Sequence, residues 1–377
     1  MKNEDVNCVI KIIDDKKLLI NEEGKIKIRG RTTSEAPKKP FRIKFSKKQQ
    51  IFNFEGKEKK WNLLANYFDT SLLRNDVAFK ISELMKYDFT PRCKPVDLIL
   101  NGKFLGSYQL CDKIEVGENR VNITKMEKQD INEPEISGGY LIELDVYAKD
   151  HSVANYLETN KGLKIGVEYP EDDDITEEQR SYIFGKINQM ENEVYNNNIS
   201  SLDLYTYSRS FLANEFIGNP DHLWSNLYFT KERNDDKFIF GPLWDFDLSF
   251  DNDKRLYPTN NKTNFCFNYT DSCGTAIKFV ETLLQNQNVK EEIKKVWEEL
   301  SNNALNSTYL LNYIEERKKY IEESASLNYL RWYNDTKEIE YAEYMRFQTL
   351  EESVESLKEY IKGRVDSLTN LLNKKLG

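Results

Sequence analysis

The sequence predicts an α+β fold, with a sheet-rich first part followed by a mostly helical second part. Two observations carry this prediction. Short β-like runs bounded by turn residues dominate up to residue 147, and stripes of apolar residues at helical spacing dominate beyond it. Since 377 residues exceed one average domain, we expect two lobes in one folding unit, spanning 1–147 and 148–377.

Four runs in the first part favour an antiparallel sheet: VNCVIKII, KIKIRG, FRIKFS and VDLILNGKFLGSYQLCDKI. Within the last run, Asn101 and Gly102 separate two apolar stretches, which is a strong signal for a hairpin. One helix interrupts the sheet, because apolar residues recur at roughly helical spacing over 70–85. A further strand is expected over 138–147.

The second part changes from strand to helix signals. Thr176 and Gln179 predict a capping box for a helix with Ile183, Ile187 and Met190 on one face. A second helix is expected over 202–217, followed by two short strands, LYFTK and KFIFGPLWDF. The rest reads as helical and ends in an amphipathic stripe that we expect to pack in the core: Val354, Leu357, Ile361, Val365, Leu368 and Leu372.

Composition excludes several classes of protein. A formal charge of −9 and a pI near 5.2 argue against a general nucleic-acid binder. No run approaches the roughly 18 apolar residues of a membrane span, and the first residues lack a signal-peptide core, so neither a membrane partner nor export is indicated. Five cysteines without a CxxC pair suggest reduced, structural thiols.

A basic patch stands out in this acidic chain: Lys38, Lys39, Arg42, Lys44, Lys47 and Lys48. It suits a phosphorylated small ligand. A solvated edge strand explains it equally well, and composition does not decide between the two.

The segment from Asn219 to Asp247 carries the chemistry. Asp221 is followed five positions later by Asn226, then by a predicted hairpin and by Asp245-Phe246-Asp247. Protein kinases share this order of a catalytic-loop aspartate, an asparagine, and an Asp-Phe-Gly whose aspartate binds Mg²⁺. Phosphoryl transfer needs a carboxylate to orient the acceptor hydroxyl, and an amide and a carboxylate to hold the metal. Since such residues also abound in turns, an ordinary loop is the alternative.

A candidate phosphate-binding segment lies nearer the N-terminus. Arg29-Gly30-Arg31-Thr32-Thr33-Ser34 joins two predicted strands, and Lys44 lies on the second of them. A turn that carries hydroxyls and arginines above a strand lysine fits a role in covering phosphates, although one glycine does not make a G-x-G-x-x-G loop.

Six segments, taken in order, resemble the successive motifs of the CotH kinase family: RGRTTSEAPKKPFRIKF, WNLLANYFDTSLLRNDVAFKI, LNGKFLGSYQLCDKIEVGENRVNI, GGYLIELD, EFIGNPDHLWSNLYF and GPLWDFDLSFDN. They cover roughly 25–252, with a weaker match in the helical tail. The resemblance implies a reduced protein-kinase-like fold with the active site between a sheet-rich N-lobe and a helical C-lobe. It also implies ATP as donor, with Mg²⁺ or Mn²⁺, and Ser or Thr of a spore-coat or surface protein as acceptor.

The resemblance also assigns roles to single residues. It implies that Asp221 is the catalytic aspartate, that Asn226 and Asp245 bind the metal, and that Asp247 adds a further ligand. Lys44 and Arg42 are implied phosphate ligands beside Arg29 and Arg31. The strand 140–145 resembles the hinge, where backbone groups of Glu143 and Leu144 would meet adenine, and Trp244 would either stack on the base or pack in the core.

Several alternatives stay open at this point. The acidic partner of Lys44 is Asp76, Glu83 or Asp112, and Asp112 stands where the family commonly has glutamate. His222 has either a hydrogen-bonding role in the catalytic loop or a purely structural one. A catalytically inactive coat or scaffold protein and an AMP-transferring enzyme of the same fold are the rival functions. The compartment is open too, because the resemblance points to the spore coat or cell surface while no signal peptide is seen.

Overall fold

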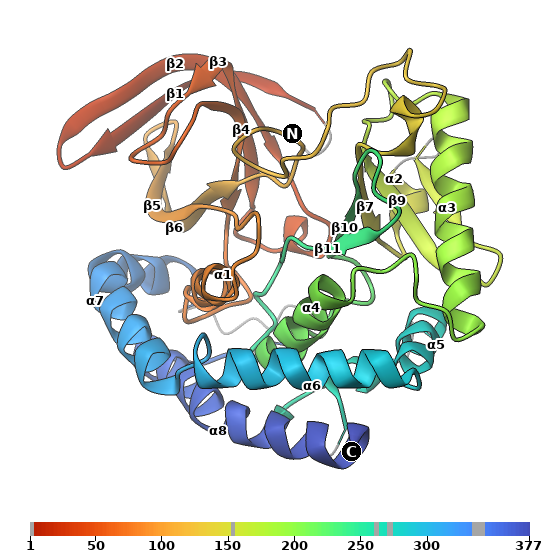
Figure 1. Cartoon of the computed structure of the whole chain (residues 1–377). Helices are drawn as coiled ribbons and strands as arrows, with labels where there is room; N and C mark the ends of the chain where they lie inside the picture. The colour runs from red at the N-terminus through yellow and green to blue at the C-terminus, as the bar shows by residue number, and fades with distance from the viewer. Residues whose placement is uncertain (1–3, 152–154, 260–263, 270–273, 334–343) are drawn as a thin grey trace. The chain divides into compact units, whose positions relative to one another are not determined.

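The computed structural model describes residues 4–151, 155–259, 264–269, 274–333 and 344–377 (Figure 1). The chain forms two compact units, each built from separate stretches. The first unit comprises 1–77, 91–114 and 311–358, and the second comprises 78–90, 115–310 and 359–377. The predicted division at 147/148 therefore falls inside the second unit.

The first unit contains an antiparallel sheet of six strands in the order β1-β2-β3-β4-β6-β5. Its strands are β1 (Val6–Asp14), β2 (Lys17–Ile28), β3 (Phe41–Gln49), β4 (Glu58–Leu64), β5 (Cys93–Leu100) and β6 (Lys103–Asp112). Asn101 and Gly102 join β5 to β6 with φ angles of 49° and 76°, which confirms the predicted hairpin. β2 is longer than predicted, and β4 was not predicted as a strand.

One face of this sheet forms the core of the first unit. Ile26, Ile43 and Trp61 lie at the same level on β2, β3 and β4, and all three are buried. Stretches of α7 (Ser307–Trp332) and α8 (Leu350–Leu376) belong to the same unit although they come later in the chain. On α7, Trp332 Nε1 donates to the Leu105 carbonyl of β6 at 2.8 Å.

The second unit contains a sheet of five strands in the order β11-β10-β7-β9-β8. Its strands are β7 (Tyr140–Leu144), β8 (Tyr156–Glu158), β9 (Lys164–Tyr169), β10 (Leu227–Lys231) and β11 (Phe238–Phe240). Its helices are α2 (Ala148–His151), α3 (Glu177–Tyr195), α4 (Leu204–Ile217), α5 (Gly274–Leu283) and α6 (Gln287–Asn302), and α1 (Arg74–Leu84) spans both units. The capping box of Thr176 and Gln179 is present at the start of α3, as predicted.

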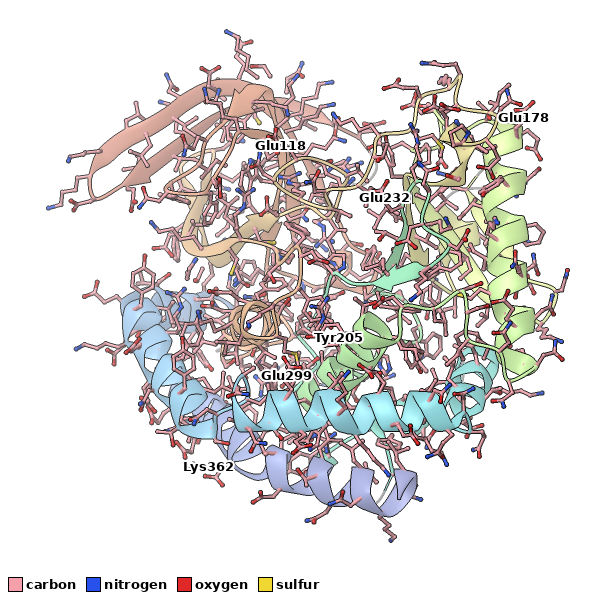
Figure 2. All side chains as sticks on the ribbon, viewed as in Figure 1. Glu118, Glu178, Tyr205, Glu232, Glu299 and Lys362 are labelled. Carbon is pink, nitrogen blue, oxygen red and sulfur yellow. The ribbon has the colours of Figure 1, made fainter. Side chains whose placement is uncertain are left out.

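The helices have solvated outer faces and buried inner faces. Glu178 on α3, Glu299 on α6 and Lys362 on α8 are exposed (Figure 2). The predicted stripe of α8 is buried at Val354, Leu357, Ile361, Leu368 and Leu372, and Val365 is half-buried. α4 has no solvated face, since every residue from Thr206 to Ile217 is buried. The helix therefore holds a fixed position in the core of the second unit, and its C-terminal end is well anchored.

Within the described part of the chain, no helix is long and apolar enough to cross a membrane. Four cysteines in that part carry free thiols, namely Cys8, Cys93, Cys111 and Cys266. This agrees with the predicted reduced thiols, while Cys273 lies outside the described residues.

Candidate active site

The candidate catalytic loop, residues 219–226, begins where α4 ends. Gly218 closes this helix with a φ of 66°, the left-handed conformation that glycine adopts without strain. A side chain there would meet the hydroxyl of Tyr360 at 2.6 Å. That hydroxyl is held in place, because it donates to the Phe216 carbonyl at 2.7 Å. Glycine is thus required where the chain leaves the helix for the loop.

Asn219 fixes the first turn of the loop. Its side-chain Nδ2 donates to Asn214 Oδ1 at 3.1 Å, and its Oδ1 accepts the backbone N–H of Asp221 at 3.1 Å. Its carbonyl accepts Nδ1–H of His222 at 2.9 Å. Because Asn214 belongs to α4, these bonds fasten Asp221 and His222 to a rigid helix.

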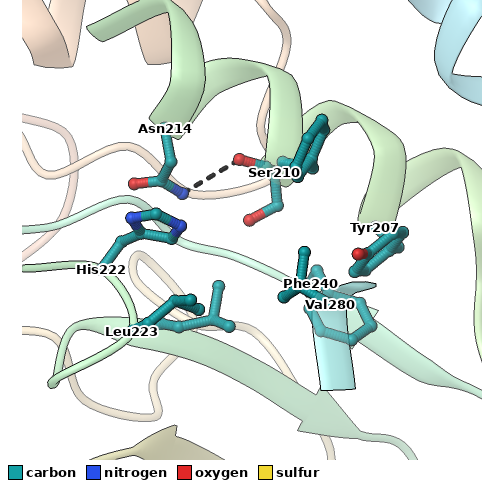
Figure 3. A pocket seen from close by; sticks show the side chains of 9 residues that line it. Tyr207, Ser210, Asn214, His222, Leu223, Phe240 and Val280 are labelled. Atoms are coloured by element: carbon teal, nitrogen blue, oxygen red, sulfur yellow. Dashed lines mark hydrogen bonds between the residues drawn. The ribbon is translucent and has the colours of Figure 1, made fainter. Parts of the chain in front are cut away.

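His222 has a structural role in this loop. It is buried, and burial lowers its pKa to about 4, so that it is neutral at physiological pH. Its ring lines a cavity of about 20 Å³ beside Ser210 and Asn214 of α4 (Figure 3). A cavity of this size has room for one water molecule. Burial and the bond to Asn219 favour the structural interpretation of His222 over a catalytic one.

The Asp221 carboxyl group lies among other charges. Burial, assisted by the carboxylates of Asp253 and Asp245 and opposed by Arg255, raises its pKa to about 6. Arg255 Nη2 is 3.5 Å from Asp221 Oδ1, and Arg255 Nε is 2.9 Å from both oxygens of Asp253. Asp253 is itself buried and therefore holds the guanidinium in place. A carboxyl group with a pKa near the working pH suits a general base.

This electrostatic arrangement predicts the pH dependence of the reaction. Asp221 accepts a proton only when ionised, so kcat/KM of the parent should rise with pH through an inflection near 6. Arg255→Gln removes the cation that lowers this pKa and should move the inflection to higher pH. A pH–rate profile measures the shift. Lys254→Gln, an exposed neighbour with the same loss of charge, should leave the inflection in place, and an unshifted profile for Arg255→Gln would contradict the assignment.

Asn226 ends the loop in a strained conformation. Its φ of 75° is left-handed, where asparagine is better tolerated than most residues. Its backbone N–H donates to Glu143 Oε1 at 2.7 Å, and its Nδ2 donates to Ser225 Oγ at 3.1 Å. The asparagine is thereby fixed by a side chain on β7, the central strand of the second sheet.

The strand predicted as the hinge is paired on both sides, so its backbone groups are not available to adenine. β7 pairs with β10 on one side and β9 on the other, and Glu143 lies opposite both Tyr228 and Gly166. The prediction that backbone groups of Glu143 and Leu144 meet adenine is therefore wrong, since both edges of their strand are occupied. The apolar, strand-forming sequence that resembles a hinge forms the centre of a sheet instead.

The segment Gly241–Asp247 presents Asp245 between two core residues. Asp245 is exposed, with a φ of 65°, whereas Trp244 and Phe246 are buried. Both rings pack on Phe79, with centroids 5.9 Å and 6.0 Å away. Trp244 is therefore a core residue and not a stacking surface for adenine. The two anchors fix the backbone on either side of Asp245, and Asp247, two residues on, is half-buried.

The loop between β2 and β3 carries the predicted phosphate-binding residues. Its ends are joined by a hydrogen bond from Arg29 N–H to the Pro40 carbonyl at 3.1 Å, and Gly30 has a φ of 82°. Ser34 donates through its hydroxyl to the Arg31 carbonyl at 2.6 Å. Arg31 is exposed and Arg29 half-buried. The loop is ordered by its own bonds.

Lys38 departs from the predicted basic patch. It is fully buried, burial lowers its pKa well below the usual range, and its ammonium lies 4.6 Å above the Tyr108 ring. Its Nζ donates to the Ser107 carbonyl of β6, while Lys39 Nζ donates to the Ser34 carbonyl at 2.9 Å. These two lysines hold the loop on the sheet, so Lys38 does not bind a solvent-borne ligand.

Lys44 belongs to a row of cations on the face of the first sheet opposite its core. It lies directly opposite Lys25 on β2 and Lys60 on β4, and at the next level Arg42 lies opposite Lys27. Burial and the charge of Arg42 lower the pKa of Lys27. Like charges that face each other across strands destabilise a sheet. An anion bound at this face would relieve that repulsion.

The three acids that competed as partners of Lys44 are engaged elsewhere. Asp76 accepts from Arg317 Nε at 2.5 Å and from the Tyr313 hydroxyl at 2.8 Å. Asp112 forms a two-pronged ion pair with Arg92, at 2.7 and 2.8 Å. Glu83 pairs with Lys80 at 3.0 Å. Each of them thus has another cation as its partner.

The donor chemistry of the second unit fits Mg²⁺ bound together with a nucleotide. Among the described residues, no three His, Cys, Asp or Glu side chains gather closely enough to hold a metal alone. Mg²⁺ commonly uses only one or two protein ligands and completes its shell with phosphates and water. The exposed Asp245 carboxylate and the Asn226 amide offer oxygen donors of this kind.

Sequence reasoning missed four residues around these predicted sites. Glu143 was assigned by its backbone although its side chain makes the contact, and Lys60 was not singled out. Arg255 and Asp253 follow the last recognised motif by only a few positions. A signal for Lys60 existed, because the sheet alternation of β3 and β4 places Lys44 and Lys60 on the same face.

Comparison with known proteins agrees with the resemblance seen in the sequence. A search of curated proteins gave no significant match. The family model described as CotH kinase protein, in contrast, matches residues 26–368. Because this match covers nearly the whole length and includes every candidate site residue above except Lys25, the chain belongs to the CotH kinase family.

Proposed function

We propose that this protein is an ATP-dependent protein kinase that transfers the γ-phosphate to Ser or Thr hydroxyls. The observation that carries the proposal is the cluster around Asp221, whose carboxyl group lies 3.5 Å from Arg255 and interacts with the charges of Asp245 and Asp253. A carboxylate that can accept the hydroxyl proton, with a second carboxylate that can hold a metal, is the arrangement that protein kinases use for phosphoryl transfer.

The residues divide the chemistry between them. Asp221 orients the acceptor hydroxyl and accepts its proton as the oxygen attacks the γ-phosphorus, while the bond to the bridging β,γ-oxygen breaks and ADP leaves. Asn226 and Asp245 would hold Mg²⁺, with Asp247 as an additional ligand. The metal, when bound, neutralises phosphate charge. Asp253 keeps Arg255 in place beside the base.

Phosphate transfer is tested directly with the full chain. The protein is incubated with γ-labelled ATP, Mg²⁺ or Mn²⁺, and a serine-rich acceptor, and the product is analysed by mass spectrometry. Label on Ser or Thr with the mass of one phosphate supports the proposal. An added AMP would identify a nucleotidyl transferase, and nucleotide binding without transfer would identify an inactive scaffold. By family, the acceptor we propose is a spore-coat or surface protein.

We further propose that Lys44 and Lys60 together contact the nucleotide phosphates. Counted from β2, which precedes the candidate phosphate loop, β4 is the third strand, the position of the phosphate-binding lysine in protein kinases. Lys60 lies there, directly opposite Lys44. Lys44→Gln and Lys60→Gln should each raise the dissociation constant of ATP about tenfold or more, because each removes a charge-assisted contact.

Without nucleotide, Lys44→Gln should stabilise the protein, although it weakens ATP binding. Since Lys44 has a lysine on both sides, Lys44→Gln removes two repulsions and should raise the thermal unfolding temperature of the nucleotide-free protein at low salt. Calorimetric titration and thermal melts measure the two effects. Lys103→Gln, an exposed residue elsewhere on the sheet, is the control of equal charge. An unchanged ATP titration for Lys44→Gln would remove this residue from the site.

A further inference from the structure

Segment 143–147, at the end of β7, lies against the candidate catalytic loop and contacts it. Contacts along segment 143–147 join it to the loop. Asn226 N–H donates to Glu143 Oε1 at 2.7 Å, and Val146 N–H donates to the Trp224 carbonyl at 2.7 Å. The rings of Tyr147 and Trp224 stack with centroids 5.7 Å apart and planes inclined by 18°. Two of these contacts hold the middle of the loop, and only the Glu143 contact reaches Asn226.

The Glu143 carboxyl group accepts hydrogen bonds from the Asn226 backbone and from the Tyr228 side chain, and its burial is costly. The side chain is buried, and burial together with the Glu168 and Asp145 carboxylates raises its pKa well above the usual range. An apolar residue at this central strand position would avoid that cost. In exchange, Oε1 accepts the backbone N–H of a residue with a left-handed φ of 75°. The carboxyl group therefore holds the conformation of Asn226, in addition to its side-chain hydrogen bond with Tyr228 of β10.

We infer that Glu143 is a positioning residue that aims the Asn226 side chain at the metal. The inference rests on the proposed function, because Asn226 is there a ligand of the nucleotide-bound metal. Removing a group that hydrogen-bonds to a metal ligand typically lowers metal affinity or activity by about 10–100-fold. Glu143 stands in that relation to Asn226, through the backbone of the ligand residue.

Two substitutions separate the hydrogen bond from the charge. Glu143→Gln keeps an amide oxygen that can accept the Asn226 N–H, whereas Glu143→Val removes the acceptor and suits a buried strand. Glu143→Val should raise the Mg²⁺ concentration needed for half-maximal ADP binding about 10–100-fold. Glu143→Gln should stay close to the parent. ADP binding without metal should be the same in all three proteins.

Calorimetry of ADP binding at graded Mg²⁺ concentrations measures this effect without any catalytic turnover. A merely structural role for Glu143 would lower the unfolding temperature and leave the Mg²⁺ dependence of the folded protein unchanged. That result would overturn the inference. Equal loss of Mg²⁺ affinity in Glu143→Gln and Glu143→Val would overturn it as well, because the charge and not the hydrogen bond would then matter.

A double-mutant cycle tests whether Glu143 acts through Asn226. Asn226→Gly removes the amide and still tolerates the left-handed backbone. If the effect passes through Asn226, adding Glu143→Val to Asn226→Gly should cause no further loss of Mg²⁺ affinity. An additive loss would contradict the inference. A parent protein whose nucleotide binding does not depend on Mg²⁺ would instead refute the proposed function itself, so the two failures are distinguishable.

Discussion

Replacing Asp221 should nearly abolish phosphate transfer without weakening nucleotide binding. Asp221→Asn keeps the shape of the side chain and removes its ability to accept a proton. Loss of a general base typically slows a reaction ~10²–10⁴-fold, and we expect kcat to fall by this amount. The dissociation constant of ATP should stay near that of the parent, because the partner of Asp221 is the acceptor hydroxyl. Transfer kinetics and calorimetric titration give the two numbers.

Stability provides a second readout for the same variant. The folded-state pKa of Asp221, about 6, lies above its unfolded value near 3.8. For an acid shifted in this direction, the stability contributed by the bound proton is present at low pH and is lost as pH rises through about 6. At neutral pH the ionised carboxylate therefore works against folding. Asp221→Asn should not lower the unfolding temperature there, and we expect a small increase.

The opposite pattern identifies a purely structural Asp221. If this residue only stabilised the turn, its replacement would lower the unfolding temperature and leave the specific activity of the folded protein near that of the parent. A stable, ATP-binding Asp221→Asn protein with parental activity would leave the proposed kinase without its base. His222→Asn is no substitute for this test, because His222 is buried and bonded to Asn219.

Local signals predicted much of the fold because they depend on neighbouring residues. The Asn101-Gly102 hairpin needs only two residues that tolerate positive φ angles. The capping box at Thr176 and Gln179 is contained within four positions. Likewise the stripe of α8 follows from spacing alone. None of these features requires knowledge of what packs against them.

Features set by distant parts of the chain were missed. β4, which contains Trp61, reads as an irregular polar and apolar mixture, and it becomes a strand because β3 and β6 pair with it on both sides. The contribution of 311–358 to the first unit is invisible to local patterns for the same reason. Strand pairing and long-range packing decide both.

The candidate site residues also show that sequence patterns miss contacts made by distant parts of the chain. Spacing singled out Asp221, Asn226 and Asp245, because a kinase-like order of residues can be read from the sequence. Lys38 was grouped with its exposed neighbours, although the Ser107 carbonyl and the Tyr108 ring bury it. Glu143 was assigned to adenine through its backbone, whereas its backbone lies in a strand that is paired on both sides and its side chain contacts Asn226. Composition and order do not show which atoms face which.

Replacing Asp245 should weaken metal-dependent nucleotide binding and transfer together. The residue has a left-handed φ of 65°, which alanine would strain, so Asp245→Asn is the appropriate change. It keeps the backbone conformation and removes the charge that a metal ligand needs. We expect Mg²⁺-dependent ATP binding to weaken about tenfold or more, since even residues behind a ligand cost 10–100-fold. Transfer should fall at least as far.

The joint loss distinguishes Asp245 from Asp221, because a metal ligand acts on the bound nucleotide and on the reaction, whereas a base acts on the reaction alone. Asp236→Asn, an exposed residue of the hairpin between β10 and β11, makes the same chemical change away from the site and should alter neither quantity. Trp244 and Phe246 anchor the segment on Phe79 in either form, so the fold should survive. If Asp245→Asn binds Mg²⁺ and ATP as the parent does, the metal lies elsewhere and the Asp-Phe-Asp segment is only a turn.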